Sequence, residues 1–149
     1  MRVESPRSVQ LVLEEFFSAP VRVEGFFLNL WSRARLGIAI DITPAWDGRV
    51  LSLEEHFAFS DGQADHKIWK LEKTGPGTYN GSREDMIGTG RVWTEGNLVR
   101  LNYVLLMVGT GLSFDETMSL GEDGILIARS TVKKWRIPIG RVDLRMRRA

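Results

Sequence analysis

Cysteine is absent from this sequence of 149 residues, and histidine occurs only twice, as His56 and His66. Without cysteine the chain can form no disulfide, use no catalytic thiol and carry no lipid on a cysteine side chain. A metal site would need both histidines beside carboxylates, and the residue alternation around His56 places it opposite the apolar side chains. We therefore expect neither a metal site nor a cofactor.

Long hydrophobic runs are also missing, since no stretch approaches the roughly 20 apolar residues of a membrane-spanning helix. The first 17 residues place Glu4, Glu14 and Glu15 around a short apolar run without a small-residue cleavage site, so they do not resemble a secretion signal. The composition, with 43% apolar and 26% charged residues, is ordinary for a globular protein. We expect a cytoplasmic protein with one domain over residues 1–149.

Acidic residues are nearly absent from the last seventeen residues, where Asp143 is alone among seven cations. The cations are Lys133, Lys134, Arg136, Arg141, Arg145, Arg147 and Arg148. Several of them alternate with Val142, Leu144 and Met146, which is typical of a half-buried strand with a solvated outer face. Single-strand nucleic-acid binders interleave aromatic residues with cations, and here there is only Trp135. We expect no nucleic-acid partner, and the oligomeric state stays open.

Helical periodicity occurs only near the start, where Ser5 can cap a helix and Pro6 suits its first turn. The apolar residues Val9, Val12, Leu13 and Phe16 would share one face. The pattern predicts one short helix within residues 1–18. After Pro20 the chain consists of short apolar runs rich in β-branched and aromatic residues, separated by turn-forming residues. These breaks fall at residues 44–48, 60–62, 74–77, 95–97, 109–111, 121–124 and 138–140.

Eight to ten strands in this space leave no room for the long crossovers of a parallel sheet. A sandwich would leave strand edges to protect, whereas a meander with short turns closes on itself. The sequence thus favours an all-β fold, an antiparallel up-and-down lipocalin-like barrel. The N-terminal helix would cover one end, and an eight-stranded barrel of this kind can hold one small ligand.

Strand alternation assigns Glu55 to the apolar face of its strand, together with Leu53 and Phe57. Burial of a carboxylate is costly unless it is paired or protonated. The same alternation directs Tyr103 inward and places Lys67 beside Trp69. It also places Arg129 on the side of Ile125 and Ile127, so that Lys67 and Arg129 are both candidate partners of Glu55.

Two interpretations of these charges stay open. They could form a satisfied interior network that fixes strand register, because buried ion pairs are weak evidence for function. They could instead mark a ligand cavity with an apolar wall and a few converging polar groups. No G-x-S-x-G motif or phosphate-binding loop is present, and neighbouring acids such as Glu54 and Glu55 face opposite ways. Glu55 alone could support catalysis.

The order of short motifs resembles the bacterial DUF3833 family from about Phe16 to Arg147. The motifs are F-x-L-x-x-W, W-D-G-x-x-L-x-L-x-E-x-F-x-F-x-D-G, K-x-W, Y-x-G, D-x-x-G, G-N and F-D-x-x-M, followed by an Arg and a Lys. The resemblance implies a lipocalin-like barrel of uncharacterised function, with many relatives secreted or lipid-anchored and often associated with genes of lipid modification. It implies no established catalytic residues.

Positions that match the family pattern include Trp46, Asp47, Gly48, Glu55, Phe57, Asp61, Gly62, Trp69, Tyr79, Gly81, Asp85, Gly88, Gly96, Asn97, Tyr103, Asp115, Met118, Arg129 and Lys134. The chain departs from the family in lacking an export segment and an anchoring cysteine. It has Lys67 where arginine is usual and Thr117 where tryptophan is usual.

The leading hypothesis is a non-catalytic barrel that binds a small amphipathic or lipid-like molecule. The expected ligand-binding residues are Glu55, Phe57, Lys67, Trp69, Tyr79, Tyr103, Arg129 and Lys134. Two alternatives stay open. One is an enzyme acting on a lipid or isoprenoid intermediate with Glu55 as general acid or base. The other is an interaction module that uses the basic final strand to contact an anionic membrane or another protein.

Overall fold

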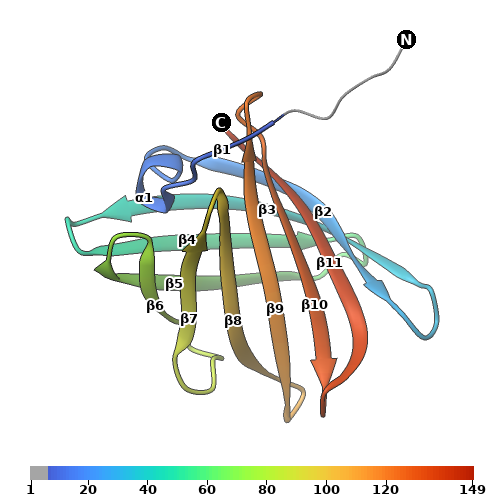
Figure 1. Ribbon diagram of the computed structural model, residues 1–149. Helices are drawn as coiled ribbons and strands as arrows, with labels where there is room; N and C mark the ends of the chain where they lie inside the picture. The colour runs from blue at the N-terminus through green and yellow to red at the C-terminus, as the bar shows by residue number, and fades with distance from the viewer. Residues whose placement is uncertain (1–6) are drawn as a thin grey trace.

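Ten antiparallel strands form a closed barrel in the computed structural model, which describes residues 7–149 (Figure 1). Each strand pairs with its neighbour in sequence, and β11 pairs with β2 to close the barrel. The strands are β2 (Val21–Asn29), β3 (Arg35–Trp46), β4 (Val50–Phe59), β5 (Ala64–Gly75), β6 (Thr78–Ser82), β7 (Gly90–Glu95), β8 (Leu98–Met107), β9 (Thr110–Gly121), β10 (Leu126–Lys134) and β11 (Ile137–Arg148). The expected up-and-down lipocalin-like barrel is therefore confirmed.

Alternation along the strands builds the interior. In β4, Leu51, Leu53 and Glu55 are buried while His56 is exposed, as the period of two predicts. Val99 and Leu101 of β8 are buried in the same way. Because every strand contributes alternate side chains to one enclosed space, the core of the protein lies inside the barrel.

The N-terminal segment covers one end of the barrel, although its helix is shorter than predicted. It forms a two-residue strand, β1 (Ser8–Val9), which pairs with β9, and a single helical turn, α1 (Leu13–Phe16). The proposed cap, Ser5, and first-turn Pro6 lie outside the described residues. Leu13, Phe16 and Phe17 are almost completely buried. This turn is held by tertiary burial of its apolar side chains, since so short a helix is unstable alone.

One predicted turn is shifted within its range, and another lies elsewhere. Pro44 belongs to β3, where it pairs with Leu53, so the chain reverses only after Trp46. Residues 138–140 belong to β11, and the turn before them is formed by Trp135 and Arg136, both with positive φ. Gly140 has a packing role instead, because a Cβ there would lie 2.3 Å from the Phe27 ring.

Strands cover only part of the barrel wall between β5 and β8. Strands β6 and β7 are short, and β5 pairs with β6 only from Lys70 onward. The wall beyond is completed by the segment 83–89, which bonds to β8 through Leu106 N to Asp85 O at 2.7 Å. An irregular segment thus carries its side chains into the wall at a place where strand alternation does not apply.

Within residues 7–149, no helix has the length and apolarity required to span a membrane.

Candidate functional site

The barrel encloses a cavity of about 430 Å³, a volume within the range of small-molecule sites. Leu13 and Phe17 close it at the α1 end. At the opposite end its lining reaches Leu36, Phe59 and Met107, and Met107 is exposed to solvent. The cavity is therefore blocked at one end and accessible at the other.

Most of the cavity wall is aliphatic or aromatic. Polar atoms are contributed by a small set that converges on the side of the interrupted wall, namely Glu55, Asp65, Lys67, Arg83, Asp85, Tyr103, Glu116 and Ser130. An apolar wall with a few convergent polar groups is the usual form of a small-molecule site.

Glu55 is the carboxyl group in this set that has the fewest partners. It lies on β4 with its side chain directed inward, as predicted, and its Oε1 atom is buried without a hydrogen bond. The closest cationic atom is Nη1 of Arg83 at 3.7 Å, which is beyond hydrogen-bond range. Burial raises the pKa of Glu55 to about 8, an effect that the Arg83 charge opposes and the Glu116 charge reinforces. At neutral pH this carboxyl group is mainly protonated and can donate a hydrogen bond.

Arg83 is neutralised by Asp85. Its Nε and Nη2 atoms donate to the two carboxylate oxygens of Asp85, each at 2.6 Å. Burial opposes ionisation of both groups, but this paired bond keeps the pKa of Arg83 raised and that of Asp85 lowered. The guanidinium also lies 5.7 Å from the Trp69 ring centre. The two residues form an ion pair without net charge at the cavity wall.

Glu116, on β9, is a second buried acid of this set. Its Oε1 accepts hydrogen bonds from the hydroxyl of Tyr103 at 2.7 Å and from that of Ser130 at 3.5 Å. Burial raises the pKa of Glu116, although both hydrogen bonds act in the other direction. Tyr103 also packs against the rings of Trp69 and Phe114 at 4.9 and 5.0 Å. Glu116 is therefore held by fixed donors, whereas Glu55 is not.

The predicted set of ligand-binding residues is divided by the structure. Glu55, Phe57, Lys67, Trp69 and Tyr103 all line the cavity. Although Lys67 is directly opposite Glu55 in the β4–β5 register, its amino group bonds to Glu84 at 3.1 Å instead. The expected pairing of Lys67 with Glu55 is wrong, because the charged segment 83–89 lies beside β5 and competes for the lysine.

Tyr79 is buried but lies outside the cavity lining. Its hydroxyl donates a hydrogen bond to Glu14, which also bonds to Lys73. Burial and the bond to Glu14 both raise the pKa of Tyr79. Burial opposes the ionisation of Glu14, but the bonds from Lys73 and Tyr79 lower its pKa overall. Tyr79 thus attaches the N-terminal segment to the barrel.

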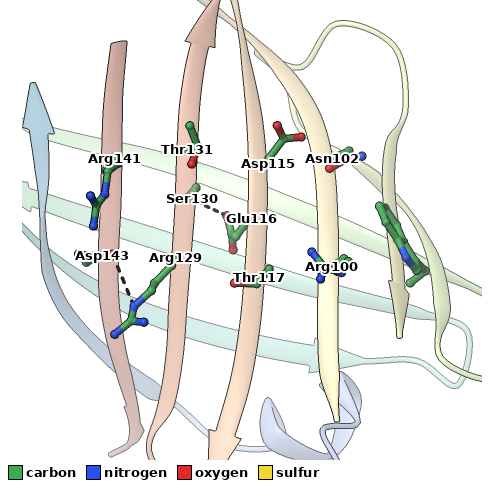
Figure 2. A pocket seen from close by; sticks show the side chains of 11 residues that line it. Arg100, Asn102, Asp115, Glu116, Thr117, Arg129, Ser130, Thr131, Arg141 and Asp143 are labelled. Atoms are coloured by element: carbon green, nitrogen blue, oxygen red, sulfur yellow. Dashed lines mark hydrogen bonds and ion pairs between the residues drawn. The ribbon is translucent and has the colours of Figure 1, made fainter. Parts of the chain in front are cut away.

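Arg129 and Lys134 do not reach the cavity. Arg129 projects from the outer face of β10 toward Asp143, 3.9 Å away (Figure 2). The inward residues of β10 are Leu126, Ala128, Ser130 and Val132. The prediction failed because both faces of this strand carry aliphatic residues, so alternation alone does not show which face is inward. Pairing of β10 with β9 and β11 determines that Arg129 lies on the outer face. Lys134 lies at the end of β10, with its amino group 4.7 Å from the Trp135 ring centre.

Five polar cavity residues were not among the predicted ligand-binding residues, namely Asp65, Arg83, Asp85, Glu116 and Ser130. Arg83 lies on an irregular segment, so no periodicity could direct it inward. Glu116 and Ser130 lie on regular strands, and alternation with Phe114 and Met118 was a signal that would have directed Glu116 inward. The cation beside Glu55 therefore comes from a loop, and both strand-borne candidates are wrong.

The outer surface of β7–β11 holds a larger depression of about 610 Å³, and its eleven lining residues are drawn in Figure 2. Several of its charged side chains are paired, Arg100 with Glu95 at 2.5 Å, Asp115 with Lys133 at 2.9 Å and Arg129 with Asp143 at 3.9 Å. Such exposed pairs contribute little energy. The interior cavity is the better candidate because it combines an apolar wall with an unpartnered buried acid.

The two histidines meet on the outer face of the barrel. His56 and His66 are cross-strand neighbours with stacked rings 4.5 Å apart, and Nε2 of His66 lies 3.0 Å from Oε2 of Glu54. The potential ligand atoms of these three residues all lie within 4.8 Å of one another. The expectation of no metal site rested on the outward direction of His56, and the structure does place His56 on the exposed face, but it also brings both histidines beside a carboxylate there.

Comparisons with known proteins identify a family and a fold. The family model "Protein of unknown function (DUF3833)" matches residues 3–148, nearly the whole chain. The chain belongs to this family, as the motif order had indicated. A search of curated proteins finds no match.

Among solved structures, the chain is similar to an S-type phycobiliprotein lyase, CPES, from Guillardia theta. The TM-score is 0.64 with 11% sequence identity, and the match covers 91% of each chain. At this identity the similarity supports the lipocalin-like barrel fold.

Proposed function

We propose that this DUF3833 barrel binds an elongated, mainly apolar small molecule whose single polar end carries an uncharged oxygen, such as a hydroxyl or carbonyl group. The observation that carries the proposal is the Oε1 atom of Glu55, which is buried and unpartnered at the wall of an accessible apolar cavity. A buried polar atom without a partner is costly. A ligand oxygen would satisfy this carboxyl group.

Charge balance supports the choice of an uncharged polar end. Arg83 is already bound by Asp85, and Lys67 is bound by Glu84. With Arg129 outside the barrel, no free cation remains among the described lining residues to attract a carboxylate. Glu55 and Glu116 both have raised pKa values, which favours their uncharged form, so these buried acids supply no positive charge for an anionic end either. A fatty alcohol, ester or isoprenoid alcohol therefore fits better than a fatty acid.

The ligand class can be tested by displacement of Nile red, a neutral fluorophore that reports apolar sites. Dodecanol, dodecanoate and dodecylamine have the same chain and differ only in the charge of the polar end. We expect dodecanol to displace the dye at about tenfold lower concentration than dodecanoate at pH 7, a difference of roughly 1.4 kcal/mol. Preferred binding of dodecanoate would contradict the uncharged polar end, and no displacement by any of the three would contradict the cavity as a lipid-like site.

Variants locate the binding. Ile40→Phe adds volume to the cavity wall, and Ile68→Phe makes the same change on the exposed face of β5. We expect dye binding to fall only in the first variant. Glu55→Gln retains a donor and should bind dodecanol, whereas Glu55→Leu should bind it about tenfold more weakly because the hydrogen bond is lost. If all four variants bound the dye and dodecanol as the wild type does, the binding site would lie outside the interior cavity.

A catalytic role for Glu55 is the second candidate, favoured by its pKa of about 8 at the wall of a solvent-connected cavity. A carboxyl group with a pKa near the working pH is suited to general acid or base catalysis. The two candidates differ in one variant. Glu55→Gln would abolish turnover of a lipid or isoprenoid substrate in an enzyme, whereas a binding protein retains its ligand affinity.

A further inference from the structure

Three consecutive hairpins around the open end of the barrel carry bulky apolar side chains at their tips. They join β2 to β3, β8 to β9 and β10 to β11 (Figure 1). We call residues 30–35, 106–109 and 133–137 the rim tips. Trp31 is 76% exposed, Trp135 is 79% exposed and Val108 is fully exposed. Most of the exposed large hydrophobic residues in the described chain lie here, the rim-tip members being Trp31, Leu106, Met107, Val108, Trp135 and Ile137.

Two of the three rim tips, residues 30–35 and 133–137, are also basic, whereas residues 106–109 carry no charge. They contain five cations and no acid, the cations being Arg33, Arg35, Lys133, Lys134 and Arg136. Lys133 is paired with Asp115, while the other four form no salt bridge within residues 7–149. The remaining two connections at this end of the barrel carry acids, with Asp61 in the β4–β5 turn and Glu84 in the segment 83–89. The unpaired positive charge at this end therefore lies on two of the three hairpins that carry the apolar side chains.

The backbone of the rim tips is unfavourable for the residues they carry. In residues 7–149, the non-glycine residues with positive φ are Arg33, Val108, Trp135 and Arg136, and all lie on rim tips. Short hairpin turns of this conformation favour asparagine and glycine. A β-branched residue such as Val108 is a true outlier at a φ of 50°. Bulky side chains at strained positions motivate the hypothesis that those side chains have a function.

We propose that the rim tips dock the open end of the barrel onto an anionic lipid bilayer. Trp31, Val108 and Trp135 would enter the headgroup region, where tryptophan is favoured at the boundary of water and hydrocarbon. Arg33, Lys134 and Arg136 would contact lipid phosphates, as basic residues do at anionic membrane surfaces. This inference is independent of the proposed ligand, although docking would direct the cavity opening toward the membrane.

A lipid surface fits these features better than a protein partner. The apolar side chains lie on separate projecting tips, whereas a protein interface requires a continuous, closely packed area. Two of the tips are nevertheless joined, because Leu30 N donates to Ile139 O at 3.0 Å and thereby connects the β2–β3 and β10–β11 hairpins. Individual apolar residues surrounded by cations are typical of proteins that lie on membrane surfaces.

The test is cosedimentation with vesicles of phosphatidylcholine alone or mixed with phosphatidylglycerol, at low and high salt. Wild-type protein should bind the anionic vesicles preferentially and lose affinity as salt rises. A triple variant should bind these vesicles at least about tenfold more weakly than the wild type. It combines Trp31→Ser, Val108→Asn and Trp135→Asn. Its thermal unfolding should occur at the same or a higher temperature, because asparagine tolerates positive φ, so that weaker binding would not reflect unfolding.

Two matched controls test whether vesicle binding depends on the rim tips alone. Trp46→Ser removes an exposed tryptophan near the opposite end, and Arg145→Gln with Arg147→Gln removes cations from β11. Both should bind vesicles like the wild type. Loss of binding in the β11 variant, unchanged binding in the rim-tip variant, or no binding of wild-type protein to anionic vesicles would each overturn the proposal.

Fluorescence quenching tests the depth of the tips. Lipids brominated on the acyl chain should quench wild-type tryptophan emission on anionic vesicles. Trp31→Phe with Trp135→Phe should remove most of this quenching while the protein still sediments, because phenylalanine retains apolar contact. A rim-tip variant that changes the oligomeric state in size-exclusion chromatography, without changing vesicle binding, would show instead that the tips form a protein interface.

Discussion

Replacement of Glu55 by glutamine should stabilise the protein at neutral pH. In the folded state burial raises the pKa of Glu55 from 4.5 to about 8. The unfolded chain ionises this group near pH 4.5, whereas the folded protein keeps it protonated. The free energy of unfolding is therefore unaffected by ionisation of Glu55 below its unfolded-state pKa. It falls as the pH rises from the unfolded-state pKa to the folded-state pKa, and it is constant again above the folded-state pKa.

The size of the effect follows from the pKa difference. Each pH unit between the two pKa values corresponds to about 1.36 kcal/mol, so the penalty at pH 7 is about 3 kcal/mol and above pH 8 approaches about 5 kcal/mol. Glutamine resembles the protonated acid in shape and does not titrate. We expect Glu55→Gln to be about 3 kcal/mol more stable than the wild type at pH 7 and nearly equal to it at pH 4.

Urea unfolding of both proteins at several pH values between 4 and 9 measures this difference. Glu116, whose pKa burial also raises, titrates in both proteins, so its contribution cancels to first order. A stability difference between wild type and Glu55→Gln that stays constant across this range would refute the reasoning.

Three further changes test the fold. Tyr79→Phe should lower stability by about 1 to 2 kcal/mol, since it removes a buried hydrogen bond to Glu14; because the pKa of Glu14 is lowered, the loss should shrink in urea unfolding as pH falls through that pKa. Gly140→Ala should cost about 2 kcal/mol by clash with Phe27, and calorimetry should show partial recovery on adding Phe27→Leu. Val108→Asn should raise stability by about 1 kcal/mol in thermal unfolding, and a decrease would contradict the strain at this turn.

Much of the barrel could be predicted because short β runs without intervening helices permit few folds. The face of Glu55 was also predictable, since only one side of β4 carries leucine and phenylalanine. The alternation was ambiguous for β10, where aliphatic residues occur on both sides of Arg129. The turn at Trp135 was missed for a related reason, because neither residue of that turn belongs to the types that favour it.

Local pattern was sufficient for strand periodicity, most turns and the inward direction of Glu55 and Tyr103, because these depend on neighbours within a few residues. The partner of Glu55 depended on tertiary structure. Arg83 reaches the cavity only because β6 and β7 are too short to complete the wall, so that an irregular segment enters between β5 and β8. Closure of the barrel likewise brought three distant hairpins to one end and created a basic, apolar rim that no single stretch of sequence displays.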